Sequence, residues 1–224
     1  HKAIRRQRQM CIRDRVYDGR YIILDYNTAD GGNRTDATLA GWNWKATQMQ
    51  EFGAGSSIAY APLTGHQALI VATSTGWSNY RHQADALAMY QLLKEHGYTD
   101  DNIILIVADD IAGNNSNPDQ GVIRVKPGGD NLYTDVQIDY RLKDLTGSDF
   151  CNILAGNVTD KTPNVLKGDE GTNLFVFWSG HGTPGALCWN ETAMGVTGVQ
   201  MQSALTQLHS NNGYRKLAMF VETC

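Results

Sequence analysis

Residues 173–182 read NLFVFWSGHG, an apolar run followed at once by a Ser-Gly-His-Gly segment. A continuous apolar run of this length is typical of a β-strand that is buried on both faces of a parallel sheet. In parallel α/β sheets, active sites form beyond the carboxyl ends of the strands. The stretch therefore predicts a buried strand over residues 173–178, and it places His181 where functional residues of such folds lie.

Three further apolar runs predict neighbouring strands. They are ALIVA at residues 68–72, NIILIV at residues 102–107 and LAMFV at residues 217–221, and segments with helical periodicity separate them. Crossovers between parallel strands are right-handed and lay their helices on the faces of the sheet. The alternation therefore predicts an α/β fold, a mostly parallel sheet flanked by helices on both faces.

Three helices are predicted from their apolar periodicity and their end signals. The first is expected over residues 79–96, with Gly97 ending it. Thr-x-x-Asp at residues 146–149 and Thr-x-x-Gln at residues 197–200 resemble capping boxes that open the other two. The residues expected on the apolar faces are Ala84, Leu87, Ala88 and Leu92 in the first helix, Phe150, Ile153 and Leu154 in the second, and Met201, Ala204, Leu205 and Leu208 in the third.

A long polar stretch, residues 109–145, follows the run at residues 102–107. A loop of this length in a compact domain is usually functional or contains a small element of its own, and residues 133–140 could supply a hairpin. Asp109 and Asp110 at its start could suggest a metal site, but no further carboxylate or His spacing completes one. We therefore interpret the pair as a solvated loop start and expect no metal.

The composition limits the classes of function. The chain has 224 residues, of which 42% are apolar, and a formal net charge of −4. This acidic balance argues against nucleic acid or an anionic membrane as a partner, and no apolar run approaches the roughly 20 residues that span a bilayer. The four cysteines show no CxxC pairing and leave the redox compartment open; they are Cys11, Cys151, Cys188 and Cys224.

The chain divides into three parts. Residues 1–15 are interpreted as sequencing-adapter read-through, because MCIRDR at residues 10–15 back-translates to a transposon end sequence used in sequencing libraries. Residues 16–65 carry short β-like pieces and are expected to be an N-terminal extension. Residues 66–224 hold the α/β pattern. We expect this α/β domain to be incomplete after Cys224, and the chain alone to be inactive and unstable.

His181 and Cys224 each follow the carboxyl end of a predicted strand. Because parallel strands end on one rim, both side chains could emerge there, and a thiol with an imidazole is the pair that acyl transfer needs. Backbone N–H groups near Gly182 and Cys224 could bind the oxyanion that develops. Taken singly, such a Cys is more often a small buried apolar residue, and such a His a hydrogen-bonded surface group.

Five short motifs occur in order along residues 66–224. They are TGWSNYRHQAD at 75–85, ADDIA at 108–112, DY at 139–140, SGHG at 179–182 and ETC at 222–224. In order and approximate spacing they resemble the motifs of the legumains, or asparaginyl endopeptidases, and the first is highly specific. The resemblance implies a caspase-like α/β fold. It also implies a cysteine endopeptidase that cleaves after Asn, possibly Asp, through a thioester acyl-enzyme.

The resemblance also implies roles for individual residues. Cys224 matches the family's nucleophile, His181 its catalytic histidine, and Asn79 the asparagine that assists the histidine. Legumains typically carry Asp immediately before that histidine, whereas this chain has Gly180. The resulting Gly-His-Gly form is closer to that of the related transamidase, which attaches lipid anchors to protein C-termini. The resemblance therefore does not extend to ligase behaviour tied to that aspartate.

Three further residues match the pocket for the substrate side chain on the acyl side of the cleaved bond: Arg81, His82 and Glu222. A cation and a carboxylate together can satisfy both the carbonyl and the amino group of an asparagine amide. A solely basic pocket would favour Asp, and a solely acidic one Arg or Lys. Without the resemblance, Arg81 and His82 would be read as an ordinary polar helix start.

Two other functions remain open at this point: a transamidase of the lipid-anchor-attaching type, and a non-catalytic α/β binding module. TSTG at residues 73–76 is not a Gly-rich phosphate loop, which argues against nucleotide binding. No cofactor is expected, and the expected partner is a peptide or protein substrate, with the oligomeric state open. Family members generally work outside the cytosol, so the resemblance implies an extracytoplasmic location: secreted, periplasmic or lysosome-like.

Overall fold

The computed structural model describes residues 13–17, 21–25, 61–190 and 192–224. The chain forms two compact units, one of residues 1–59 with Cys224 and one of Tyr60–Thr223. The larger unit contains the α/β pattern that the sequence predicts.

The smaller unit contains two described strands, β1 (Arg13–Tyr17) and β2 (Tyr21–Asp25), which pair antiparallel. Strand β2 coincides with one of the short β-like pieces expected in the N-terminal extension. Most of residues 1–15 and 16–65, to which the adapter and extension interpretations apply, lie outside the described residues.

A five-stranded parallel sheet forms the centre of the larger unit, in the order β10-β6-β3-β4-β5. All four predicted strands are confirmed, and a short fifth one was not foreseen. The strands are β3 (Gly65–Ala72), β4 (Ile103–Val107), β5 (Tyr140–Arg141), β6 (Thr172–Ser179) and β10 (Lys216–Glu222).

Alternating side chains of the central strands enter two separate cores. In β3, Leu69 and Val71 join the cluster on one face, whereas Ala68, Ile70 and Ala72 join the cluster on the other. Successive side chains of a strand point to opposite faces, so an unbroken apolar run supplies both cores at once. This confirms the prediction of a sheet buried on both sides.

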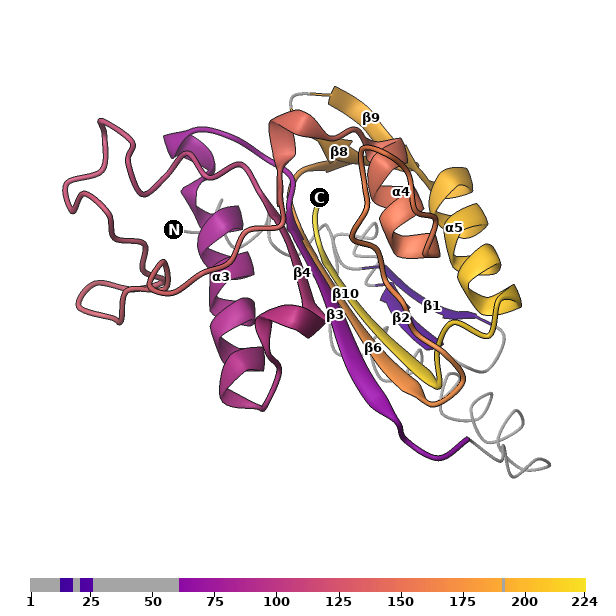
Figure 1. The fold of residues 1–224 in the computed structure, drawn as a ribbon. Helices are drawn as coiled ribbons and strands as arrows, with labels where there is room; N and C mark the ends of the chain where they lie inside the picture. The colour runs from indigo at the N-terminus through magenta and orange to yellow at the C-terminus, as the bar shows by residue number, and fades with distance from the viewer. Residues whose placement is uncertain (1–12, 18–20, 26–60, 191) are drawn as a thin grey trace, which may run out of the picture. The chain divides into compact units, whose positions relative to one another are not determined.

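Helix α3 (Tyr80–Glu95) covers one face of the sheet (Figure 1). It follows a 3₁₀ turn, η1 (Trp77–Asn79), and ends at Glu95; Gly97, just after the C-cap His96, has a positive φ that allows the chain to turn away. The predicted apolar face was partly wrong, because Leu92 is 45% exposed. The aromatic Tyr90, omitted from that prediction, sets the buried row at three-residue spacing: Ala84, Leu87, Tyr90 and Leu93.

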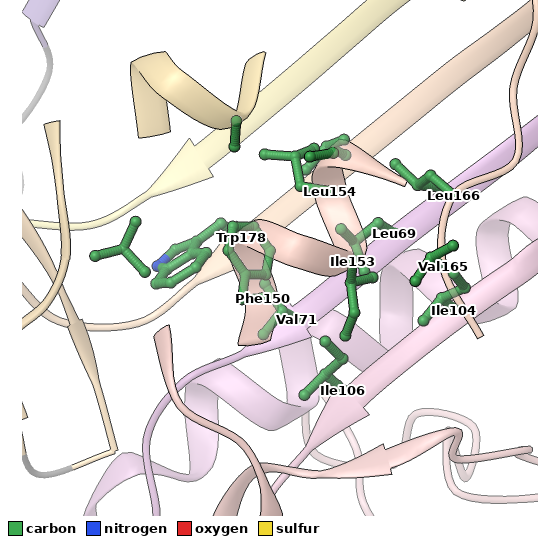
Figure 2. Packing of buried hydrophobic residues seen from close by; sticks show 14 of the residues in the cluster. Leu69, Val71, Ile104, Ile106, Phe150, Ile153, Leu154, Val165, Leu166 and Trp178 are labelled. Atoms are coloured by element: carbon green, nitrogen blue, oxygen red, sulfur yellow. The ribbon is translucent and has the colours of Figure 1, made fainter. Parts of the chain in front are cut away.

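Helices α4 (Gly147–Ala155) and α5 (Gly198–Ser210) cover the opposite face (Figure 1). Both predicted capping boxes are present, with Thr146 and Thr197 as the N-caps. Figure 2 shows how the side chains of α4 pack onto the sheet; the ring of Phe150 meets that of Trp178 edge-on at 4.9 Å. Of the residues predicted to face the core on α5, Ala204 and Leu208 are buried, and Met201 and Leu205 are partly buried.

A small antiparallel sheet beyond the end of β6 was missed by the sequence patterns. It consists of β7 (Gly182–Thr183), β8 (Ala186–Trp189) and β9 (Thr192–Thr197), in that order. Its strands are short, and tight turns separate them, so periodicity gives little signal. The side chains of Trp189 and Val196 complete the core under α4 and α5.

The hairpin expected over residues 133–140 does not form. Tyr140 instead pairs in parallel with Ile106, which makes β5 an added strand of the main sheet. The loop before it is irregular but is held by side chains, notably Asn117, whose amide donates to three backbone carbonyl groups. Backbone groups that lack a ladder must find such partners, so the loop is ordered without secondary structure.

Strand β10 lies at the edge of the described sheet, and the side chains of Phe220 and Val221 on it are exposed. None of the helices in the described part of the chain combines the length and the apolar character needed to cross a membrane.

Candidate active site

His181 lies two residues beyond the end of β6, at the carboxyl rim of the parallel sheet. Its backbone carbonyl accepts a hydrogen bond of 2.9 Å from Cys188 N–H, which anchors the loop to β8. Its ring Nε2 lies 2.9 Å from Asn79 Oδ1. A carbonyl oxygen can only accept, so the imidazole donates from Nε2, and Nδ1 of the neutral ring is the basic nitrogen.

Asn79 is held in place by the loop that follows β3. Its Nδ2 donates to the carbonyl of Thr75 at 2.8 Å, which fixes the orientation of the amide and presents Oδ1 to the histidine. The loop turns at Gly76, which has a φ of 80°, and the N–H of Gly76 donates to Asp110 Oδ2 at 2.7 Å. Glycine adopts a positive φ of this size without steric cost, so a residue with a side chain at position 76 would strain the backbone.

His82 on the first turn of α3 packs against His181. The two ring centroids are 4.9 Å apart and the planes are nearly perpendicular, at 89°. Nδ1 of His82 shares a hydrogen bond with Ser74 Oγ, and only 3% of the residue is exposed. Burial, with smaller contributions from the charges of Arg81 and His181, lowers the pKa of His82 from 6.5 to about 4. His82 is therefore uncharged at neutral pH.

Asp109 and Asp110 are not a solvated loop start, because both carboxylates accept hydrogen bonds from other parts of the domain. Asp110 accepts from Gly76 N–H and, at 2.6 Å, from Gln83 Nε2, so it joins the two loops at the rim. Asp109 accepts from the hydroxyl of Tyr133 at 2.6 Å, and its hydrogen bond raises the pKa of that tyrosine to about 12. Within the described ranges, no three His, Cys, Asp or Glu side chains are grouped as a metal site.

Glu222 ends β10 and pairs with Ser179 at the end of β6. The N–H of Gly180 donates to the carbonyl of Glu222 at 3.1 Å, and the hydroxyl of Ser179 donates to the Glu222 carboxylate at 3.3 Å. Cys224 follows Glu222 by two residues, as His181 follows Ser179, and it is exposed. Along the chain, Cys224 thus follows the end of β10 at the same interval as His181 follows the end of β6.

The remaining expected residues lie on or next to the same rim. Arg81 is exposed, and its guanidinium donates to the carbonyl of Ser78 at 3.3 Å. It forms no ion pair with Glu222 among the described residues. Its positive charge contributes to the lowered pKa of the neighbouring His82.

Gly182 opens β7, opposite Leu187 of β8. Since Cys188 N–H donates to the carbonyl of His181, Gly182 and Leu187 form a pair without ladder hydrogen bonds. In such a pair the N–H groups point away from the partner strand. The N–H of Gly182, the residue next to His181, therefore points away from β8.

Sequence reasoning did not single out Ser74, Gln83 or Asp110 as parts of the site, although they hold its loops in place. Part of the signal was present, because Gln83 belongs to the motif at residues 75–85 and Asp110 to the motif at residues 108–112.

Gly180 packs directly against Thr73. A Cβ at Gly180 would lie 2.0 Å from Thr73 Oγ1 and 3.3 Å from Thr73 Cβ. We expect Gly180→Ala to lower the free energy of unfolding by about 1 to 3 kcal/mol, because two buried groups would have to separate. In a Thr73→Ala background the same change should cost less, since the clashing hydroxyl is gone.

Chemical denaturation of the four proteins in this double-mutant cycle measures the coupling. The hydroxyl of Thr73 has no hydrogen-bond partner among the described residues, so its removal breaks none of their hydrogen bonds. Additive effects of the two substitutions would contradict the steric account.

These features define a class: a parallel α/β domain with a histidine oriented by an asparagine at the sheet rim, and a cysteine after the adjacent strand. Comparison with known proteins agrees with this class. The model of the peptidase C13 family matches residues 66–224. The chain belongs to the peptidase C13 family, and its sheet with helices on both faces agrees with the caspase-like fold that the resemblance implied.

Several relatives resemble the chain over the same region. A vacuolar-processing enzyme delta-isozyme from Arabidopsis thaliana is 37% identical over 160 residues, or 70% of this chain and 34% of the relative. A legumain from Rattus norvegicus is 35% identical over 163 residues, covering 71% and 37%. A vacuolar-processing enzyme from Citrus sinensis is 39% identical over 160 residues, covering 70% and 32%. The chain thus spans about a third of the length of these relatives.

Proposed function

We propose that the protein is a cysteine endopeptidase that hydrolyses peptide bonds after Asn, with Asp as a secondary possibility. The observation that carries this proposal is the hydrogen bond between His181 and Asn79. His181 follows Ser179, which pairs with Glu222, the residue two positions before Cys224. An imidazole held by a carbonyl oxygen has a defined tautomer, and its other nitrogen is then directed at a reacting group.

The proposed reaction uses Cys224 as nucleophile and His181 as the proton carrier. The Cys224 sulfur, after giving its proton to Nδ1 of His181, attacks the carbonyl carbon, and the N–H of Gly182 stabilises the oxyanion. Nδ1 then protonates the leaving amine as the C–N bond breaks, leaving a thioester. Water attacks the thioester with Nδ1 as base, which releases the acid and restores the thiol.

Arg81, His82 and Glu222 are proposed to form the pocket for the Asn side chain. The exposed guanidinium and carboxylate would bind the amide carbonyl and amino group, respectively. His82 follows Arg81 in the chain and is buried, so it would contribute to the floor of the pocket.

The printed names of the relatives support this proposal, because they include legumains and vacuolar-processing enzymes. By the same resemblance we propose a peptide or protein substrate and an extracytoplasmic location: secreted, periplasmic or lysosome-like.

The full-length protein should cleave a peptide with Asn before the cut bond at least tenfold faster than matched peptides with Gln or Lys there. We expect Arg81→Ala and Glu222→Ala each to lower kcat/KM for the Asn peptide by about tenfold to a hundredfold, since each leaves one end of the amide unpaired. Initial rates with fluorogenic peptides measure this. Equal losses on all peptides would contradict a pocket role.

A transamidase is the second candidate, and Gly180 is the observation that favours it. Cleavage in the presence of an added amine separates the two: a dominant amide product indicates transamidation, and a dominant acid product indicates hydrolysis. The third candidate, a non-catalytic binding module, would be favoured if an Asn-containing electrophilic peptide failed to label Cys224.

A further inference from the structure

The contacts of His82 are unusual for a residue of a substrate pocket. Its side chain is buried, one ring nitrogen is engaged by Ser74, and its ring is packed edge-on against His181. A group that binds substrate gains by presenting its polar atoms to the ligand. Here the structure uses one nitrogen of the ring for Ser74 and the ring itself for the neighbouring histidine.

We propose that His82 is a positioning residue, whose buried ring fixes the plane of the His181 imidazole while Asn79 fixes its tautomer. The proposal rests on the function proposed above and deepens it. Together the two contacts restrain His181 in different ways, since the hydrogen bond holds one edge of the ring and the perpendicular ring limits its rotation.

Rotation of the His181 ring matters because Nδ1 must serve two successive positions, that of the sulfur and that of the leaving amine. A misplacement of about 1 Å in such a group can cost roughly a hundredfold in rate. A single hydrogen bond leaves the ring free to swing about it, and a second contact perpendicular to the ring removes much of that freedom.

The charge of His82 suits this role. In the proposed reaction His181 becomes an imidazolium, and a second cation beside it would oppose that step. The positive groups acting on His82 are Arg81 on its own helix and His181 on the loop after β6, and together with burial they keep His82 neutral. The face of a neutral aromatic ring can accommodate an adjacent cation, whereas a charged ring would repel it.

Two substitutions separate the ring contact from the hydrogen bond. His82→Phe keeps a flat ring against His181 but cannot bond to Ser74, whereas His82→Gln can bond to Ser74 but has no ring. We expect kcat for the Asn peptide to fall by about tenfold or more in His82→Gln, with KM changed less than threefold. In His82→Phe we expect the loss of kcat to be at least about threefold smaller than in His82→Gln, because the ring contact is kept.

The double variant with Ser74→Ala and His82→Phe serves as the matched control, because it removes the hydroxyl that His82→Phe leaves unpaired in the interior. Its kcat should be no lower than that of His82→Phe. Circular dichroism and thermal unfolding would show that all three variants fold.

Other outcomes would overturn the proposal. Loss of kcat in His82→Phe with retention in His82→Gln would assign the effect to the Ser74 hydrogen bond. A rise in KM with altered preference between Asn and Asp peptides, at constant kcat, would leave only a pocket role. Unchanged kinetics in both variants would remove any role in the reaction.

NMR of the full-length protein with ¹⁵N-labelled histidine gives a readout without turnover. We expect the His181 ring to show a single tautomer with the proton on Nε2 in the wild type and in His82→Phe, and averaged signals in His82→Gln. Identical signals in all three would overturn the proposal. Absence of turnover and of Cys224 labelling in the wild type would instead contradict the proposed function, so the two failures are distinguishable.

Discussion

Replacing Cys224 with Ala in the full-length protein is expected to lower kcat/KM for the Asn peptide at least about 1,000-fold. The sulfur is the only group proposed to form a covalent bond with the substrate, so its loss removes the thioester route and not merely a binding contact. Binding of the peptide should persist, because the proposed pocket residues Arg81 and Glu222 are intact. Initial rates and equilibrium binding of the uncut peptide measure the two effects separately.

Cys151→Ala is the matched control for this experiment. Cys151 lies half-buried beside a cavity between α4 and α5, and burial raises its pKa to about 11, so it is a protonated thiol at neutral pH. Activity should be unchanged in Cys151→Ala. Retention of more than a tenth of the activity in Cys224→Ala would contradict the assignment of the nucleophile.

The second large effect concerns stability in acid. His82 has a pKa of about 4 in the folded protein, against 6.5 for the free side chain. Between these values the unfolded chain binds a proton at His82 and the folded chain does not. The free energy of unfolding should therefore fall as the pH drops from about 6.5 to about 4, by about 3 kcal/mol from this residue alone.

Comparison of the wild type with His82→Gln isolates this contribution. Glutamine does not titrate, so the difference in unfolding free energy between the two proteins should shift by about 3 kcal/mol in favour of the variant between pH 7 and pH 4. The carboxylates that also change their charge over this range are common to both proteins and cancel in the difference. Urea denaturation at several pH values measures it, and a constant difference would show that His82 titrates in the folded protein as it does in the unfolded one.

Much of the fold could be predicted from the sequence because its strands are unusually uniform. The runs at residues 68–72 and 173–178 are apolar on both faces, which only a sheet covered on both sides can bury. The capping boxes at Thr146 and Thr197 were confirmed because their side chains act within four residues. Such local patterns survive in the folded protein since tertiary contacts do not oppose them.

The misses have a different origin. Leu92 was assigned to the core although the buried row of α3 runs through Tyr90, whose large ring decides which face packs on the sheet. The antiparallel sheet β7-β8-β9 depends on strand pairing across turns, and β5 depends on pairing with β4, far away in the chain. Strand pairings of this kind cannot be predicted from the periodicity of apolar residues along the chain.

In the site, too, a local motif could be recognised from the sequence, whereas contacts between distant segments could not. The motif at residues 75–85 pointed to Asn79, and the structure places its side chain on His181. The burial of His82 and its contacts with Ser74 and His181 could not be foreseen, because they arise from the way the loop after β3 folds back onto the start of α3.

A crystal structure of the full-length protein reacted with an electrophilic peptide ending in Asn is the most direct test of the pairing of a thiol with an imidazole. The account predicts a covalent bond from Cys224 Sγ to the peptide, His181 Nδ1 within about 3.2 Å of the position that the leaving nitrogen occupies, and the N–H of Gly182 directed at the peptide oxygen. A peptide bonded to another residue, or a His181 ring pointing away from the sulfur, would contradict it.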